Sequence, residues 1–269
     1  MQLSCRALSE KNFLAIGTVE LSTTDQIIQM LNVIACSIMA FGPISTIAYL
    51  LVSKRSHLAI IAVVGSFFWM LSNVLSAILW VAIPPLKNNW GWIIPSGVAV
   101  QELMRYLFYY VYQHSETAIV KAMNDPRTKV PLNDLSSSFS AGVGYGLMQS
   151  IVIFGSVLEN GFGEGTYYTT ECSSMSLFTL TAFTTCFVSI SQICWMVIGF
   201  NGYRNKSGVR IGLLILLHLG SSMTSLLNQQ PNMCIVSVIV QCVVMFISVA
   251  CAVISQRNAV LKQGERVRV

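Results

Sequence analysis

The sequence predicts an all-α membrane protein: a seven-transmembrane helix bundle with its N-terminus on the lumenal or extracellular side and its C-terminus in the cytoplasm. Three observations lead to this fold class. Of the 269 residues, 54% are hydrophobic and only 10% are charged, whereas a soluble domain carries about 25% charged residues. Seven long apolar runs follow one another along the chain. Lysine and arginine gather in alternate connections between those runs.

Each apolar run has a length typical of a helix that crosses the hydrocarbon core, about 17–25 residues at a rise of about 1.5 Å each. The sixth run is the shortest, and the third is the one that contains acidic and basic side chains. The predicted spans are residues 27–52, 58–83, 93–113, 139–158, 177–200, 211–228 and 233–255. Together they form one transmembrane domain, residues 27–255, with no separate soluble domain.

The basic residues of the connections predict the orientation of the bundle. Twelve of them fall on one side and three on the other, and the side rich in lysine and arginine is the cytoplasmic one. The twelve are Lys54, Arg55, Lys121, Arg127, Lys129, Arg204, Lys206, Arg210, Arg257, Lys262, Arg266 and Arg268, and the three are Arg6, Lys11 and Lys87. These charges suit the inner leaflet and are not those of a nucleic-acid-binding protein.

Two terminal segments lie outside the predicted bundle. Residues 1–26 are interrupted by charges and lack the apolar stretch of a signal peptide, so we expect a poorly ordered extension. Residues 256–269 form a basic cytoplasmic tail.

The third span contains Glu102 and Arg105 at membrane depth. Charged side chains there are energetically expensive and usually face the interior of the bundle or a cavity. Their i,i+3 spacing lets the two side chains interact on one helix face. One interpretation is a mutually neutralised pair that holds helices together, with help from Gln101. The other is an ion or proton relay, although no other span offers an acidic partner.

The fourth span contains small residues four positions apart: Gly142, Gly146 and Ser150. Steps of four residues keep them on nearly one helix face, while Gly144 points elsewhere. Small residues mark the contact faces of membrane helices, because close approach of the backbones drives helix association in lipid. The face either receives a helix of another protein or packs within this bundle, and both interpretations are open.

Polar residues of three spans fall at similar depth. His218 is seven residues, and Gln192 and Arg105 are each eight residues, from the cytoplasmic end of their predicted span, which corresponds to about 10–12 Å. The short connection 201–210 makes the fifth and sixth helices neighbours. We therefore hypothesise a buried polar layer in which His218 hydrogen-bonds to Gln192 or to the Glu102/Arg105 pair. The alternative is a histidine that only fills space.

The eight cysteines suggest little redox chemistry. Six of them lie in predicted spans, where cysteine serves as a small packing residue. Cys5 and Cys172 remain on the lumenal side, where a disulfide between them is an open alternative.

The catalytic constellations known from membrane enzymes are missing. Aspartyl cleavage needs two carboxylates, and Glu102 is the single acid in the predicted spans. The sequence contains no G-x-S-x-G, H-E-x-x-H or phosphate-binding loop motif. We expect a protein that is not an enzyme, with no catalytic residue, no metal site and no cofactor. The runner-up is a small-solute or ion transporter that uses Glu102, Arg105 and His218.

Five segments in order resemble one known family. They are "AFGP", "FFWMLS", "QELMRYLFYY", "AGVGYGLMQS" and "LLHLGSSMTSLLN", in the first, second, third, fourth and sixth spans. Together they resemble the anterior-pharynx-defective family, the seven-helix scaffold subunit of gamma-secretase. The resemblance runs from about Met30 to the basic tail.

The resemblance implies a noncatalytic role in complex assembly. Its partners would be nicastrin, presenilin and presenilin enhancer, and the catalytic aspartates would belong to presenilin. The complex would process Notch-type and other single-span membrane proteins in the endoplasmic reticulum, Golgi and plasma membrane.

The resemblance also assigns roles to residues. The family's assembly motif falls on Gly142, Gly146 and Ser150, and the second of its two intramembrane histidines falls on His218. The first falls on Gln192, a departure that keeps hydrogen bonding but loses protonation. A second departure is residues 1–29, because family members begin almost at the first helix.

Overall fold

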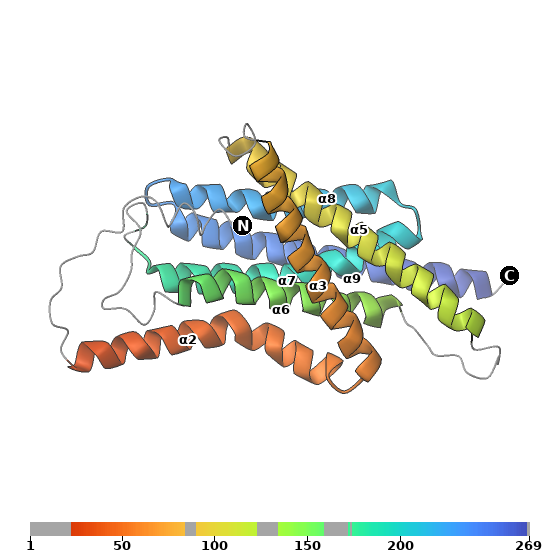
Figure 1. Ribbon diagram of the computed structural model, residues 1–269, viewed down its shortest axis with the longest axis horizontal. Helices are drawn as coiled ribbons and strands as arrows, with labels where there is room; N and C mark the ends of the chain where they lie inside the picture. Colours follow the sequence, from red (N-terminus) through yellow and green to blue (C-terminus); the bar gives the residue numbers. More distant parts are fainter. Residues whose placement is uncertain (1–22, 84–89, 123–133, 159–171, 173, 268–269) are drawn as a thin grey trace.

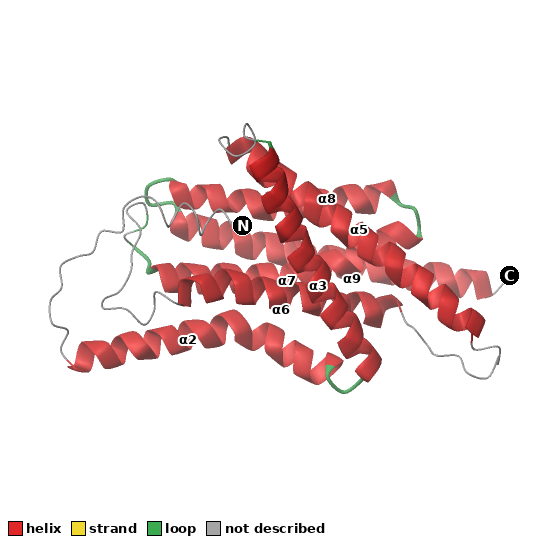
Figure 2. Cartoon of the chain, viewed as in Figure 1, coloured by secondary structure: helices red, strands yellow, loops and turns green. Residues whose placement is uncertain are grey.

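The computed structural model describes residues 23–83, 90–122, 134–158, 172 and 174–267. Every element in these ranges is helical (Figure 2). In chain order the elements are α2 (Thr23–Ile47), the π-helical turn η1 (Ala48–Val52), α3 (Ser56–Ala82), α5 (Trp90–Ala122), α6 (Asp134–Leu158), α7 (Leu177–Arg204), α8 (Gly208–Met223), the 3₁₀ helix η3 (Thr224–Gln229) and α9 (Cys234–Val267).

Six segments are long and apolar enough to cross a membrane, which confirms an all-helical membrane protein. They are Ile27–Val52, Ser56–Ala82, Asp134–Leu158, Leu177–Arg204, Gly208–Gln229 and Cys234–Arg257. The predicted third span lies in α5, which has 33 residues. Its charged pair and its tyrosines make α5 less apolar than the others. The count of seven spans therefore remains a prediction, as does the orientation.

Helix α7 forms the centre of the bundle and contacts α2, α6, α8 and α9. Its most apolar stretch is 72% buried inside the protein, against 22–28% for α2, α3, α8 and α9. Ser176 ends the preceding segment as the N-cap, and its hydroxyl accepts a hydrogen bond from the Thr179 amide at 3.2 Å. The helix therefore starts at Leu177, where the sequence predicts it.

Helices α3 and α5 cross the rest of the bundle obliquely (Figure 1). Helix α3 packs on α6 and on α5. Helix α2 contains Pro43, which cannot donate a backbone hydrogen bond, and it ends in η1. Figure 1 shows the resulting bend along α2.

Some helix limits differ from the expected spans. Helix α5 begins at Trp90 and ends at Ala122, and α9 continues to Val267 through most of the predicted basic tail. Hydropathy marks only the part of a helix that lies in lipid, so a helix that continues into water exceeds its predicted span. Of the predicted N-terminal extension, residues 1–22 lie outside the described residues.

The interpretation of Cys172 and Cys234 needs correction. Cys172 forms a disulfide with Cys234, the first residue of α9, and the two Cα atoms are 5.9 Å apart. The suggested pairing of Cys172 with Cys5 is therefore wrong, and Cys5 itself lies outside the described residues. Cys234 was expected to be a packing residue because its run was counted as lipid-buried from Met233 onward. It lies instead at the very start of its helix.

Candidate functional site

The small residues of the fourth span pack against helix α7 of the same chain. A β-carbon at Gly142 would lie 2.6 Å from Ile193 Cα, and one at Gly146 would lie 2.7 Å from the Ser189 carbonyl oxygen. Real β-carbons do not come so close to backbone atoms, so only glycine fits at these positions. Ser150 is fully buried and donates a hydrogen bond to the Gly146 carbonyl at 2.9 Å. The face is therefore filled by α7, and no helix of another protein can occupy it.

Gly144 makes the second close contact of α6, on the opposite side. A β-carbon there would overlap the Ala62 carbonyl oxygen of α3. The Gly144 carbonyl accepts a hydrogen bond from Ser66 at 2.9 Å. Helix α6 is thus held between α7 and α3 by small residues on two faces, which is why it is buried to more than half along its length.

A continuous chain of hydrogen bonds crosses the centre of the bundle and joins four helices. Gln149 of α6 accepts a hydrogen bond from Gln192 Nε2 of α7 at 2.6 Å. The Oε1 atom of Gln192 accepts from Arg105 Nη2 of α5 at 2.6 Å. Arg105 Nη1 donates to Glu102 Oε1, one turn earlier on α5. The same Glu102 oxygen is 2.5 Å from His218 Nδ1 of α8.

The charges of this polar chain cancel. Glu102 and Arg105 are 8% and 0% exposed, so a net charge there would be costly, and their pairing removes it. A carboxylate oxygen can only accept, so Nδ1 of His218 carries the proton that it donates to Glu102. The pair is thus held neutral by its own helix and oriented by two neighbouring helices.

Aromatic rings enclose Arg105 and His218 of this polar chain. The Trp195 ring stacks on His218 with centroids 4.5 Å apart. The Arg105 guanidinium lies 5.5 Å from the ring centre of Tyr145 and 6.0 Å from that of Trp195. Such contacts stabilise a cation that has been taken out of water. They also restrict the rotamers of the arginine and the histidine, which makes the arrangement rigid.

The structure brings together four of the five residues placed in the hypothetical layer: Glu102, Arg105, Gln192 and His218. Gln101 is buried, but among the described residues it makes no hydrogen bond to any member of the polar chain. Adjacent residues on a helix point about 100° apart, so Gln101 faces away from its neighbour Glu102. Gln149 was missed, although an amide in the middle of an apolar run was the available signal.

A second polar cluster joins the ends of three helices. Arg204, at the end of α7, bridges Glu116 of α5 and Asp134 of α6, each at 2.8 Å. It is 40% exposed. Within the described ranges, no group of three histidine, cysteine or acidic side chains gathers in a way that could hold a metal ion.

Gln192→Leu is expected to destabilise the protein by about 1–3 kcal/mol, because a leucine leaves Arg105 Nη2 and Gln149 Oε1 buried without a partner. Gln192→His is the matched control, since a neutral imidazole has one donor and one acceptor and can serve both neighbours. The midpoints of thermal unfolding in detergent would compare the two variants. Equal losses in both would contradict the double role of Gln192.

Comparisons with known proteins place the chain in a family. Residues 31–258 match the family model described as Aph-1 protein. "Gamma-secretase subunit APH1-like" of Arabidopsis thaliana is 28% identical over 212 residues, which is 76% of this chain and 84% of that protein. "Gamma-secretase subunit Aph-1" of Drosophila melanogaster is 28% identical over 203 residues, 72% of this chain and 79% of that protein. "Gamma-secretase subunit APH-1B" of Mus musculus is 25% identical over 202 residues, covering 72% and 77%.

The matched range runs from the first part of α2 into α9, and it leaves out residues 1–30 and the residues after 258. The family model accounts for well over half of the 269 residues, and the relatives are covered over more than two thirds of their own length. This chain belongs to the Aph-1 family.

Proposed function

We propose that this chain is the noncatalytic scaffold subunit of a gamma-secretase complex. Its partners are presenilin, nicastrin and presenilin enhancer, and the complex processes Notch-type and other single-span membrane proteins. Membership of the Aph-1 family carries the proposal, since relatives from plant, insect and mammal are all named gamma-secretase subunits. The transporter alternative finds no support in these comparisons.

The state of Glu102 supports a noncatalytic role. Acid catalysis by carboxylates needs two acids that can share a proton. Glu102 is bound by Arg105 and His218 and is buried, so it is occupied as a structural anion. The peptide-bond chemistry of the complex therefore falls to a partner subunit.

The proposal includes seven membrane spans with a lumenal N-terminus and a cytoplasmic C-terminus. The count includes α5, whose 33 residues exceed the length needed to cross the hydrocarbon core. Its charged pair is neutralised inside the bundle, so composition alone underestimates how well α5 suits a membrane. The twelve-to-three distribution of basic residues supports the orientation. The multi-pass protein would reside in the endoplasmic reticulum, Golgi and plasma membrane.

Two sets of residues would serve assembly. Gly142, Gly146 and Ser150 let α6 and α7 meet closely, so that partners dock on a bundle of fixed shape. Glu102, Arg105, Gln192 and His218 set the rotation of α5, α7 and α8 about their axes. Both sets act on partners through the shape of this chain.

Copurification is the direct test of the scaffold function. An affinity-tagged full-length chain, expressed in cells of its own source and extracted in mild detergent, is expected to retain a single-span and a nine-span partner in stoichiometric amounts. Mass spectrometry would identify them as nicastrin-like and presenilin-like proteins. The control is the same chain with His218→Ala, which is expected to recover several-fold less of both.

The conditions must preserve a gamma-secretase complex from a reference cell line. If the chain is then recovered without either partner, the scaffold proposal is wrong. Solute flux by the purified chain alone would also contradict it.

A further inference from the structure

Helices α7 and α9 lie parallel, and two polar contacts join them in one constant register. Trp195 Nε1 of α7 donates to Ser248 Oγ of α9 at 3.1 Å, across 53 positions of sequence. Asn201 Nδ2 donates to the Ser255 carbonyl at 2.7 Å, across 54 positions. The contacting residues are 53 and 54 positions apart in the sequence, so α7 and α9 keep one register between these two contacts.

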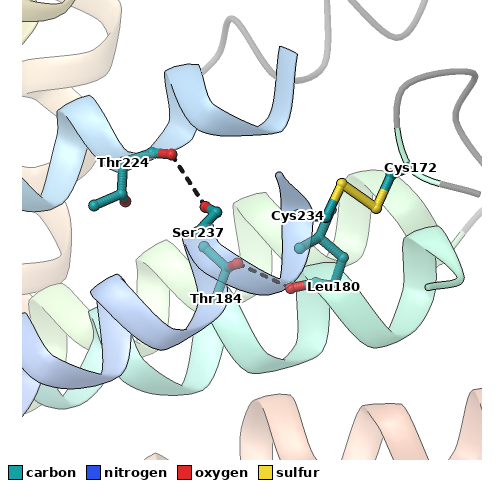
Figure 3. The surroundings of a disulfide bond; sticks show 6 residues. All are labelled: Cys172, Leu180, Thr184, Thr224, Cys234 and Ser237. Carbon is teal, nitrogen blue, oxygen red and sulfur yellow. Dashed lines mark hydrogen bonds between the residues drawn. A yellow bond between two sulfur atoms is a disulfide. The ribbon is translucent and has the colours of Figure 1, made fainter. Parts of the chain in front are cut away.

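The same register holds at the other end of the pair, where a disulfide lies beside it. Cys172 precedes α7 by a few residues, and Cys234 is the first residue of α9. Leu180 of α7 packs against both cysteines and lies 54 positions before Cys234. Figure 3 shows the sulfur–sulfur bond beside Leu180, with Thr184 one turn further along α7. Leu180 thus keeps the register of the two hydrogen bonds, and the covalent bond ties the start of α9 to the segment that precedes α7.

The other polar contacts near the start of α9 are made with η3 and with the end of α8. Ser237 Oγ donates to the Thr224 carbonyl at 3.0 Å, as Figure 3 also shows. Gln241 donates to Ser221 at 2.7 Å and accepts from Thr224. In the described part of the chain, the disulfide is therefore the one bond that ties the first turn of α9 to the segment leading into α7.

Both sulfur atoms are shielded once the helices have packed. Cys172 and Cys234 are 1% and 0% exposed, and the half-buried side chains of Met175 and Val238 pack against them. A thiol reagent or an oxidising enzyme cannot reach them in the packed state. The bond must therefore form before this end of the bundle closes.

The disulfide lies at the end of the bundle that we propose to face a compartment in which disulfides form. It lies at the helix ends opposite to the Arg204–Glu116–Asp134 cluster, on the side that we propose to be lumenal. Disulfides form and persist in the secretory lumen but are rare in the cytosol. The inference thus rests on the proposed orientation.

We infer that oxidation of Cys172 and Cys234 by a lumenal dithiol oxidoreductase is a maturation step that fixes the start of α9 beside α7. One cysteine thiolate attacks the disulfide of the oxidised enzyme and forms a mixed disulfide. The second thiolate then displaces the enzyme's sulfur. The chain loses two thiol protons and two electrons, and the enzyme's disulfide becomes a dithiol. The start of α9 is then held beside α7 when partners meet the bundle.

Thiol counting on the wild-type chain tests this inference without any variant. Full-length protein, with its partners, is denatured in an alkylating reagent with and without prior reduction. The chain has eight cysteines, so two more thiols per chain are expected to react after reduction. A peptide linked through Cys172 and Cys234 is expected in the unreduced digest. Alkylation of all eight cysteines without reduction would overturn the inference.

Serine variants test whether the bond matters. Cys172→Ser, Cys234→Ser and the double variant are expected to reduce the recovery of assembled protein by the same several-fold factor, because each removes the same bond. Cys251→Ser is the matched control, a free and half-buried cysteine on α9, and is expected to assemble normally. Losses that multiply in the double variant would mean two independent packing residues and would contradict a single bond.

The outcomes separate this inference from the proposed function. A glycosylation site inserted at residue 165 reports the orientation by itself. Glycosylated protein with reduced cysteines would overturn the maturation step and keep the orientation. A linked peptide in protein that binds no partner would keep the maturation step and overturn the scaffold function.

Discussion

Gly144→Ala is expected to separate α3 from α6 and to destabilise the bundle by about 1–3 kcal/mol, the range for overpacking a close contact. The added methyl group would overlap the Ala62 carbonyl oxygen, which is part of the α3 backbone and cannot rotate away. The two helices must therefore move apart, and the Ser66–Gly144 hydrogen bond of 2.9 Å is lost with them. Thermal unfolding in detergent, followed by the fraction that stays monodisperse, would measure the effect.

Gly155→Ala is the control on the same helix. A β-carbon at Gly155 meets no atom within 4 Å, and alanine favours the helix by about 1 kcal/mol over glycine. This variant is expected to unfold at the same temperature as the wild type or slightly above it. If both alanine variants behave alike, the contact between α3 and α6 is looser than the structure indicates.

Arg105→Met is expected to destabilise the protein by about 3–5 kcal/mol, the usual effect of removing one partner from a buried ion pair. Glu102 would keep its negative charge at membrane depth with His218 as its remaining neighbour, and Gln192 would lose its donor. The loss should also lower the recovery of partner subunits, because the rotation of α5 is no longer fixed. Unfolding midpoints and copurification yields would be measured on the same preparations.

Two further variants show whether the unpaired charge is the cause. The double variant Glu102→Gln, Arg105→Met is expected to recover part of the stability, because it removes both charges together. Arg204→Met removes an arginine that also makes two ion pairs but is 40% exposed. Exposed pairs contribute about 0–1 kcal/mol each. An Arg105→Met loss no greater than that of Arg204→Met would mean that the central pair contributes little.

Hydropathy and depth counting predict much of this fold because lipid imposes strict demands on sequence. A backbone in hydrocarbon must satisfy its own hydrogen bonds, so each apolar run of sufficient length becomes a helix. The start of α7 at Leu177 was predictable to the residue. Counting residues from the predicted cytoplasmic ends also places Arg105, Gln192 and His218 at one depth, since helical rise is nearly constant.

The rotation of each helix about its axis, and the contacts between residues far apart in the sequence, could not be predicted in the same way. Depth counting does not say which way a side chain points, so Gln101 was grouped with Glu102 although it faces away from the polar chain. Gln149 lies among the small residues of α6, which predict close backbone contact and give no sign of a side-chain hydrogen bond. The Arg204–Glu116 pair joins residues 88 positions apart, and no local pattern links them.

The disulfide shows a limit of another kind. Cys234 stands at the edge of its apolar run, where a shift of one residue moves a side chain between lipid and water. Hydropathy defines such edges only to within a turn. A cysteine placed inside the span is interpreted as a packing residue. Cys5 then remains as the predicted partner of Cys172, although the disulfide joins Cys172 to Cys234.

The charged pair of α5 has a consequence for how the chain is made. An arginine at the middle of a helix lowers the tendency of that helix to leave the translocon by about 2.5–3.5 kcal/mol. The side chains that hydrogen-bond to this pair belong to α7 and α8, which the ribosome synthesises later. We therefore expect α5 to be retained at the insertion machinery until those helices emerge, so that the third segment would enter the bilayer only in the company of its successors.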